Sequence, residues 1–102
     1  MLVEFSIIPL GKGESMGEEI ARVINIVDKS GLPYRANPMG TVVEGGWDEV
    51  MAVVKKCHEE IIKNSQRAVS TITIDDRPAK PRNRMTEKLI SIEKRLGREV
   101  KK

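Results

Sequence analysis

Hydrophobic and polar residues alternate along two stretches of the chain, which is the periodicity of a β-strand. The first stretch runs from Leu2 to Pro9, with Val3, Phe5 and Ile7 on one side. The second, from Ala68 to Asp75, alternates in the same way and is rich in β-branched residues, which favour strands. Each pattern predicts a strand, and the proline is expected to end the first one.

Two other stretches repeat their apolar residues at helical spacing. Ser15 and Glu18 form a capping box that predicts the start of a helix, and Gly31 followed by Pro33 predicts its end. A second helix is expected to begin after the pair of glycines at 45 and 46. The predicted apolar stripes are Ile20, Val23, Ile24 and Val27 in the first helix, and Trp47, Val50, Val54, Cys57 and Ile61 in the second.

A hairpin is predicted between the two helices. Two short extended runs flank the tetrapeptide Asn37-Pro38-Met39-Gly40. The first begins at Tyr34, and the second is Thr41 to Glu44. The proline cannot donate a hydrogen bond to a sheet, which places the turn near an exposed edge. Gly40 is expected to supply a positive φ.

The chain changes character after Asp75-Asp76-Arg77. Pro78 and Pro81 predict a stiff extended linker, and a charged helix follows it. The apolar stripe of that helix is narrow, which favours docking onto another element or subunit rather than burial in a single core. The predicted organisation is a core domain over residues 1–77, and a basic linker with a terminal helix over residues 78–102 that packs on the core or on a neighbouring subunit. The stripe consists of Met85, Leu89, Ile92 and Leu96.

The order of these elements predicts an α+β fold of the ferredoxin-like type. A βαββαβ chain with two one-sided helices packs most simply with both helices on one face of a four-stranded antiparallel sheet, plus the extra C-terminal helix. The other face of the sheet then carries a mixture of small polar, apolar and acidic side chains. A second subunit or a ligand is expected to cover that face.

Composition limits the classes of function. The chain has 102 residues, 39% hydrophobic and 32% charged, which is typical of one globular domain, and no apolar run approaches the ~20 residues of a membrane span. The N-terminal residues do not resemble a secretory signal, and the lone Cys57 favours a reducing cytoplasm.

Residues that could carry catalysis are few. The single Cys57 and the single His58 both fall on a helix, and no nucleophile with a neighbouring base is found. Asp75 and Asp76 would point to opposite faces of a strand, so they are not expected to form a metal pair unless the strand ends between them. The expectation is a protein that is not an enzyme and holds no metal.

Charge is distributed unevenly. Residues 1–76 contain 8 basic and 12 acidic side chains, a net charge of −4, whereas residues 77–102 contain 10 basic and 3 acidic ones, a net charge of +7. A basic tail can contact nucleic acid, or it can dock on the acidic surface of its own body or of a sister subunit. The second interpretation is preferred, because the three aromatic residues offer few platforms for stacking bases.

Three motifs resemble those of the small thiamine-binding protein family. They are Ser6-Ile7-Ile8-Pro9-Leu10-Gly11, then Met39-Gly40-Thr41 with Glu44, and Ile74-Asp75-Asp76-Arg77. The resemblance covers about Val3 to Leu96. It implies a one-domain ferredoxin-like protein that forms a homotetramer, binds a small ligand near subunit contacts, and has no established catalysis or cofactor beyond thiamine as the candidate ligand.

The resemblance also implies a set of ligand-binding residues, to which the hairpin chemistry adds Asn37. Thiamine carries a cationic thiazolium ring and an aminopyrimidine, so its site needs carboxylates, small hydroxyl groups and an apolar wall. Alternatively, the acidic and basic members form an ion pair at a subunit contact and the hydroxyl residues are ordinary strand residues. The competing function is binding of nucleic acid or a regulatory partner through the tail. The candidate residues are Ser6, Asn37, Met39, Gly40, Thr41, Glu44, Asp75 and Arg77.

Overall fold

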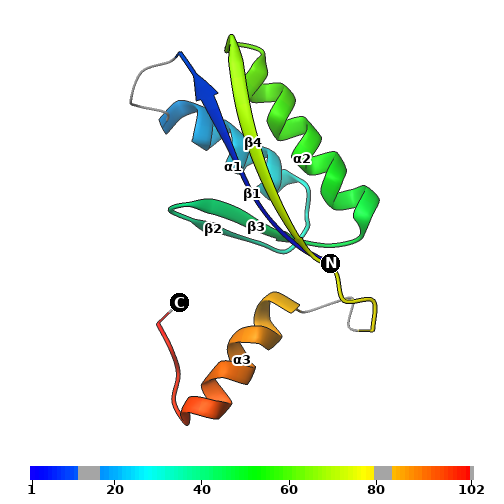
Figure 1. The fold of residues 1–102 in the computed structure, drawn as a ribbon, viewed down its shortest axis with the longest axis vertical. Helices are drawn as coiled ribbons and strands as arrows, with labels where there is room; N and C mark the ends of the chain where they lie inside the picture. The colour runs from blue at the N-terminus through cyan, green and yellow to red at the C-terminus, as the bar shows by residue number, and fades with distance from the viewer. Residues whose placement is uncertain (12–16, 80–83, 102) are drawn as a thin grey trace.

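The computed structural model describes residues 1–11, 17–79 and 84–101. Its elements follow the predicted order and form a four-stranded antiparallel sheet in the order β2-β3-β1-β4, the ferredoxin-like arrangement (Figure 1). The fold prediction is thereby confirmed. The elements are β1 (Leu2–Leu10), α1 (Gly17–Lys29), β2 (Tyr34–Asn37), β3 (Gly40–Glu44), α2 (Trp47–Ile62), β4 (Arg67–Asp75) and α3 (Arg84–Leu96).

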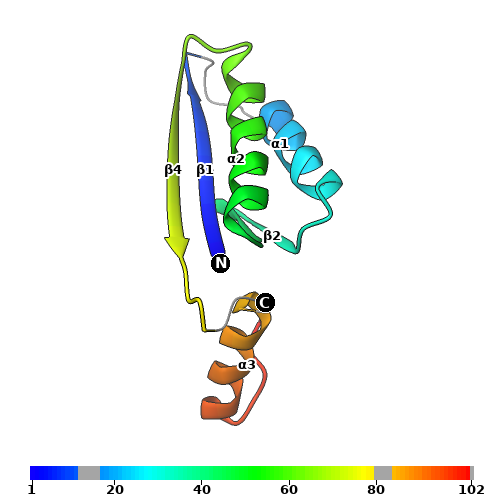
Figure 2. The ribbon, with the colours of Figure 1, turned by 90° about the vertical axis from the view of Figure 1, so that its right-hand side faces the viewer.

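Helices α1 and α2 cover one face of the sheet, as Figure 2 shows. Val3 and Phe5 of β1 point toward them and are 0% and 1% exposed. The core continues into both helices through Val27, Val50 and other buried residues, because each helix presents one apolar face to the sheet. None of the described helices is long and apolar enough to cross a membrane.

The opposite face of the sheet is not covered by the two core helices. The register sets Ile8 of β1 beside Val69 of β4 on this face, and both are exposed. On the helix side, Ile72 and Ile74 also keep more than a third of their surface exposed, because β4 is the edge strand. The fold therefore leaves apolar surface on both sides of β4.

Three local predictions need correction. Strand β1 does not end at Pro9 but continues to Leu10, because beyond Phe5 one edge of β1 has no paired strand and tolerates a residue without an N–H. Gly40 does not have a positive φ; a Cβ there would lie 3.2 Å from the Phe5 carbonyl oxygen, so close approach of two strands explains the glycine. Trp47 is 56% exposed rather than buried, since it is the first residue of α2.

The ends of the helices agree with the sequence where the structure describes them. Gly31 has a φ of 78° just after α1, as expected for a glycine that ends a helix. Ser15, the predicted N-cap of α1, lies outside the described residues. Pro81, the second proline of the predicted linker, also lies outside them.

Helix α3 stands apart from the two-layer core (Figures 1 and 2). It contributes no buried residue, and Ile90, Ile92 and Leu96 are 42%, 46% and 51% exposed. The molecule is accordingly elongated, with extents of 47 × 28 × 21 Å. Of the narrow apolar stripe predicted for this helix, Met85 and Leu89 are half-buried, whereas Ile92 and Leu96 are exposed.

Candidate functional site

A cavity of about 400 Å³ lies between the end of β1, the start of α1 and the tip of the β2–β3 hairpin. It forms because β3 pairs with β1 only as far as Phe5, whereas β4 pairs with β1 as far as Leu10. Beyond Phe5, β1 is thus no longer hydrogen-bonded to β3, and residues of α1 line the cavity opposite β1. The volume is within the range of roughly 300–1,000 Å³ that is usual for small-molecule sites.

Apolar side chains make most of the wall of this cavity. Ile7 and Ile8 come from β1, and Ile20 and Ile24 come from α1. The sequence predicted Ile20 as part of the buried stripe of α1, yet it is 53% exposed, because it borders the cavity rather than the core. A wall of this kind can receive the apolar surface of an organic ring.

Five of the candidate binding residues line this cavity: Ser6, Asn37, Met39, Gly40 and Thr41. Thr41 is 7% exposed, whereas Met39 is 88% exposed at the tip of the hairpin. Thr41 is paired with Phe5 and lies on the helix side of the sheet, so the next residue of β1, Ser6, lies on the other side. The two hydroxyl groups therefore do not project from the same face.

Glu19 of α1 also lines the cavity, although it belongs to none of the three sequence motifs. Its side chain is only 14% exposed, and its Oε1 lies 3.9 Å from Nη2 of Arg22. Arg22 is in turn 3.3 Å from Glu60 of α2. Glu19 is the single carboxylate among the described residues that border the cavity. The available signal was its position four residues before the buried Val23, which turns it toward the sheet.

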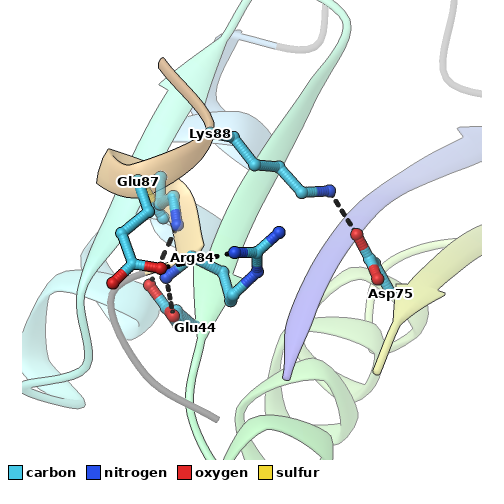
Figure 3. A network of polar contacts seen from close by, with 6 residues as sticks. Glu44, Asp75, Arg84, Glu87 and Lys88 are labelled. Atoms are coloured by element: carbon cyan, nitrogen blue, oxygen red, sulfur yellow. Dashed lines mark hydrogen bonds and ion pairs between the residues drawn. The ribbon is translucent and has the colours of Figure 1, made fainter. Parts of the chain in front are cut away.

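Glu44 lies at the other end of β3 and holds the start of α3. It is 5% exposed, and its Oε2 and Oε1 accept hydrogen bonds from the main-chain N–H groups of Arg84 at 2.5 Å and Met85 at 3.3 Å (Figure 3). The first N–H groups of a helix have no partner within the helix, and the helix dipole favours a negative charge there. Glu44 is thus satisfied by its own chain.

Asp75 makes the second contact between the core and α3. It accepts a hydrogen bond from Lys88 Nζ, a contact drawn in Figure 3. This hydrogen bond and the charge of Lys88 lower the pKa of Asp75 below its ordinary value. Glu44 and Asp75 both flank Leu2, at the end of the sheet away from the hairpin tip, and neither lines the cavity.

Arg77 belongs to a different hollow. It lines a cleft of about 740 Å³ beside α3, together with four basic side chains of that helix. The structure therefore divides the eight candidate residues among three places: five at the cavity, two at the contacts with α3, and one in this cleft.

The two reactive residue types of α2 lie away from both hollows. Cys57 is fully buried, and burial raises the pKa of its thiol to about 11. His58 Nδ1 is 2.7 Å from the hydroxyl of Ser70. Among the residues that the structure describes, no group of three or more His, Cys, Asp and Glu side chains is placed to hold a metal ion.

Several relatives resemble this chain along nearly its whole length. UPF0045 protein Mb1933 of Mycobacterium bovis is 41% identical over 99 residues, which cover 96% of each chain. UPF0045 protein MJ1052 of Methanocaldococcus jannaschii is 38% identical over 92 residues, which cover 90% of this chain and 91% of that protein.

Solved structures show the same fold. The crystal structure of the Methanocaldococcus protein matches with a TM-score of 0.82 over 89% of this chain and 93% of that one. A Thermotoga maritima protein, provisionally named as a thiamine biosynthesis/salvage protein, matches with a TM-score of 0.76 at 26% identity, over 89% of this chain and 96% of that one. The family model described as thiamine-binding protein matches residues 3–93. With the sheet order, the motifs and these likenesses in agreement, the chain belongs to the thiamine-binding protein family.

Proposed function

We propose that this protein binds thiamine, or its hydroxymethylpyrimidine moiety, in the cavity beside the hairpin, and that it does so without catalysis. Membership of the thiamine-binding family supports a small-molecule-binding role, and the name of the Thermotoga relative is consistent with thiamine. The observation that carries the proposal is an apolar cavity of about 400 Å³ whose described lining includes one carboxylate, Glu19.

The chemistry of the walls suits the two halves of thiamine. The cationic thiazolium needs a negative partner, and the Glu19 carboxylate is well covered, so water screens its charge less than at an exposed site. The aminopyrimidine needs donors and acceptors, which Asn37 and Thr41 offer from the hairpin. The isoleucines of β1 and α1 would contact the rings.

Calorimetric titration with thiamine tests this proposal. The wild-type protein should give a saturable isotherm, and Glu19→Gln should weaken binding by about ten- to a hundredfold, the loss expected for a hydrogen-bonded charge. Glu18→Gln is the matched control, because this neighbour carries the same charge, is exposed and does not line the cavity. A flat titration at millimolar thiamine contradicts the proposal.

A third variant separates the two candidate carboxylates. Glu44→Gln should leave thiamine affinity unchanged, because Glu44 is bound to the first turn of α3. If Glu44→Gln abolishes binding and Glu19→Gln does not, the ligand binds at the α3 end of the sheet and not at the hairpin cavity.

We further propose that the protein is a homotetramer whose subunit contacts adjoin this cavity. The support is the apolar surface that one chain leaves exposed, including Ile8 and Val69 on the open face and Ile72 and Ile74 at the edge strand. Sedimentation should give about four times the 11.4 kDa mass of the chain. A single species of 11.4 kDa at micromolar concentration would contradict the tetramer without touching the thiamine proposal.

A further inference from the structure

The cleft beside α3 is a second hollow with a chemistry opposite to that of the first. Its volume is about 740 Å³, and it lies between the segment that follows β4 and one face of α3. Of the nine described residues that line it, five are basic, one is acidic, and none is aromatic. The basic residues are Arg77, Arg84, Lys88, Lys94 and Arg95.

The basic groups gather in this cleft because of helical spacing. Positions 84, 88, 91 and 95 are four, three and four residues apart, so Arg84, Lys88, the hydroxyl of Ser91 and Arg95 share one face of α3. Arg77 approaches from the other wall. The row from Arg84 to Arg95 is about 16 Å long at 1.5 Å per residue.

Part of this charge is held in position by other contacts. Arg84 is paired with Glu87 at 3.3 Å, its side chain is 12% exposed, and Lys88 is paired with Asp75. By contrast, Arg77, Lys94 and Arg95 form no ion pair with any described residue. The described lining therefore combines two cations held in ion pairs with three that form none, although the charge of Arg77 also acts on Asp75. Its five cations exceed the two carboxylates Glu87 and Asp75 by three charges.

We propose that this cleft binds a small molecule that carries a diphosphate group. Guanidinium groups donate paired hydrogen bonds to phosphate oxygens, a serine hydroxyl can add another, and the excess charge matches that of a diphosphate. A single-stranded nucleic acid fits less well, because the lining offers no aromatic side chain on which a base can stack.

Titration of the full-length protein with inorganic pyrophosphate at low salt tests the proposal. The wild type should bind it saturably and more tightly than orthophosphate. Arg77→Gln combined with Arg95→Gln should weaken binding at least tenfold, because each removes an unpaired cation of the lining. The matched control is Lys29→Gln with Lys101→Gln, which changes the net charge equally at exposed positions outside the cleft.

Three results would overturn the proposal: no binding of pyrophosphate by the wild type, equal weakening in both double variants, or binding unaffected by either. A single-stranded oligonucleotide that binds through Arg77 and Arg95 and is not displaced by pyrophosphate would also overturn it, and would make the cleft a nucleic-acid surface. Thiamine affinity should be the same in all these variants. The outcome is therefore independent of the thiamine proposal.

Discussion

Two carboxylates show how the environment of a residue decides its role. Glu44 stands in a family motif and was the natural partner for a cation, yet it is 5% exposed and accepts two main-chain hydrogen bonds from α3. Glu19 resembles an ordinary acidic residue in the first turn of a helix, yet it borders the cavity. The same functional group thus anchors an element in one place and borders a cavity in the other.

Cys57 offers a prediction at the same scale. Because burial raises the pKa of its thiol to about 11 and the side chain is fully buried, almost no reactive thiolate is accessible near neutral pH. Iodoacetamide at pH 8 should label the folded protein slowly, and one equivalent should react rapidly in denaturant. Since the sequence has one cysteine, mass spectrometry gives an unambiguous count. Rapid labelling of the folded protein would show that α2 opens readily.

At the scale of elements, α3 is attached at its first turns and little elsewhere. Glu44 holds the N–H groups of Arg84 and Met85, and Asp75 holds the ammonium group of Lys88. The rest of the helix adds no buried side chain. Its position consequently depends on a few polar contacts rather than on an apolar interface.

Replacing Glu44 by glutamine tests this attachment. A neutral amide interacts less favourably with a helix N-terminus than a carboxylate, a difference of about 0.3–2 kcal/mol. Amide hydrogen exchange at Arg84 and Met85 should become faster by up to about thirtyfold. Glu49→Gln is the control, since Glu49 is exposed and is not one of the described residues that hydrogen-bond to α3. Unchanged protection in Glu44→Gln would mean that other contacts hold the helix.

The ion pair between Asp75 and Lys88, the second contact between the core and α3, should break only at low pH. The pKa of Asp75 in the folded protein is lowered by Lys88, so the ion pair adds stability that is complete above the ordinary value of 3.8 and is lost as the pH falls through the lowered folded value. The carboxyl signal of Asp75 in an NMR titration should therefore shift below pH 3.8. Lys88→Gln should return its midpoint toward the ordinary value. A midpoint above 3.8 in the wild type would contradict the contact.

At the scale of the whole molecule, the buried hydrophobic core belongs to residues 1–77, and the terminal segment adds little to it. Every residue of the buried hydrophobic cluster lies between Met1 and Ile61, and the two helices that enclose it precede β4. The terminal segment brings most of the positive charge and two of the contacts just described. The terminal segment therefore contributes mainly positive charge at the surface, and α3 adds no buried residue to the core.

Truncation after Arg77 tests this division. The remaining chain should still fold cooperatively, because it keeps the sheet and the buried cluster. It should lose some stability, because Glu44 would no longer accept hydrogen bonds from the N–H groups of α3, at a cost of about 1.5–3 kcal/mol. In urea denaturation, Glu44→Gln should therefore destabilise the truncated chain less than it destabilises the full chain. A truncated chain without a cooperative transition would show that α3 is part of the folding unit.

The fold could be predicted from the sequence because its signals are local. Alternation from Leu2, the helical stripes and the hairpin turn each depend on neighbouring residues, and together they determine a βαββαβ order. The site could be predicted only in part. Its cavity depends on where β3 stops pairing with β1, and on the direction of Glu19 from a helix, which are both three-dimensional facts. Motif membership alone did not separate the hairpin residues from Glu44, Asp75 and Arg77.

The incomplete pairing of β1 has one more consequence. Beyond Phe5, the side of this strand that faces the cavity has no neighbouring strand in the part of the chain described, so its peptide groups there are left without ladder partners. A guest molecule that enters would meet amide and carbonyl groups of the backbone itself as well as side chains. Mutation alters side chains freely but removes a peptide donor only by introducing proline, as at Pro9. These backbone groups of the cavity wall therefore change less with mutation than its side chains do.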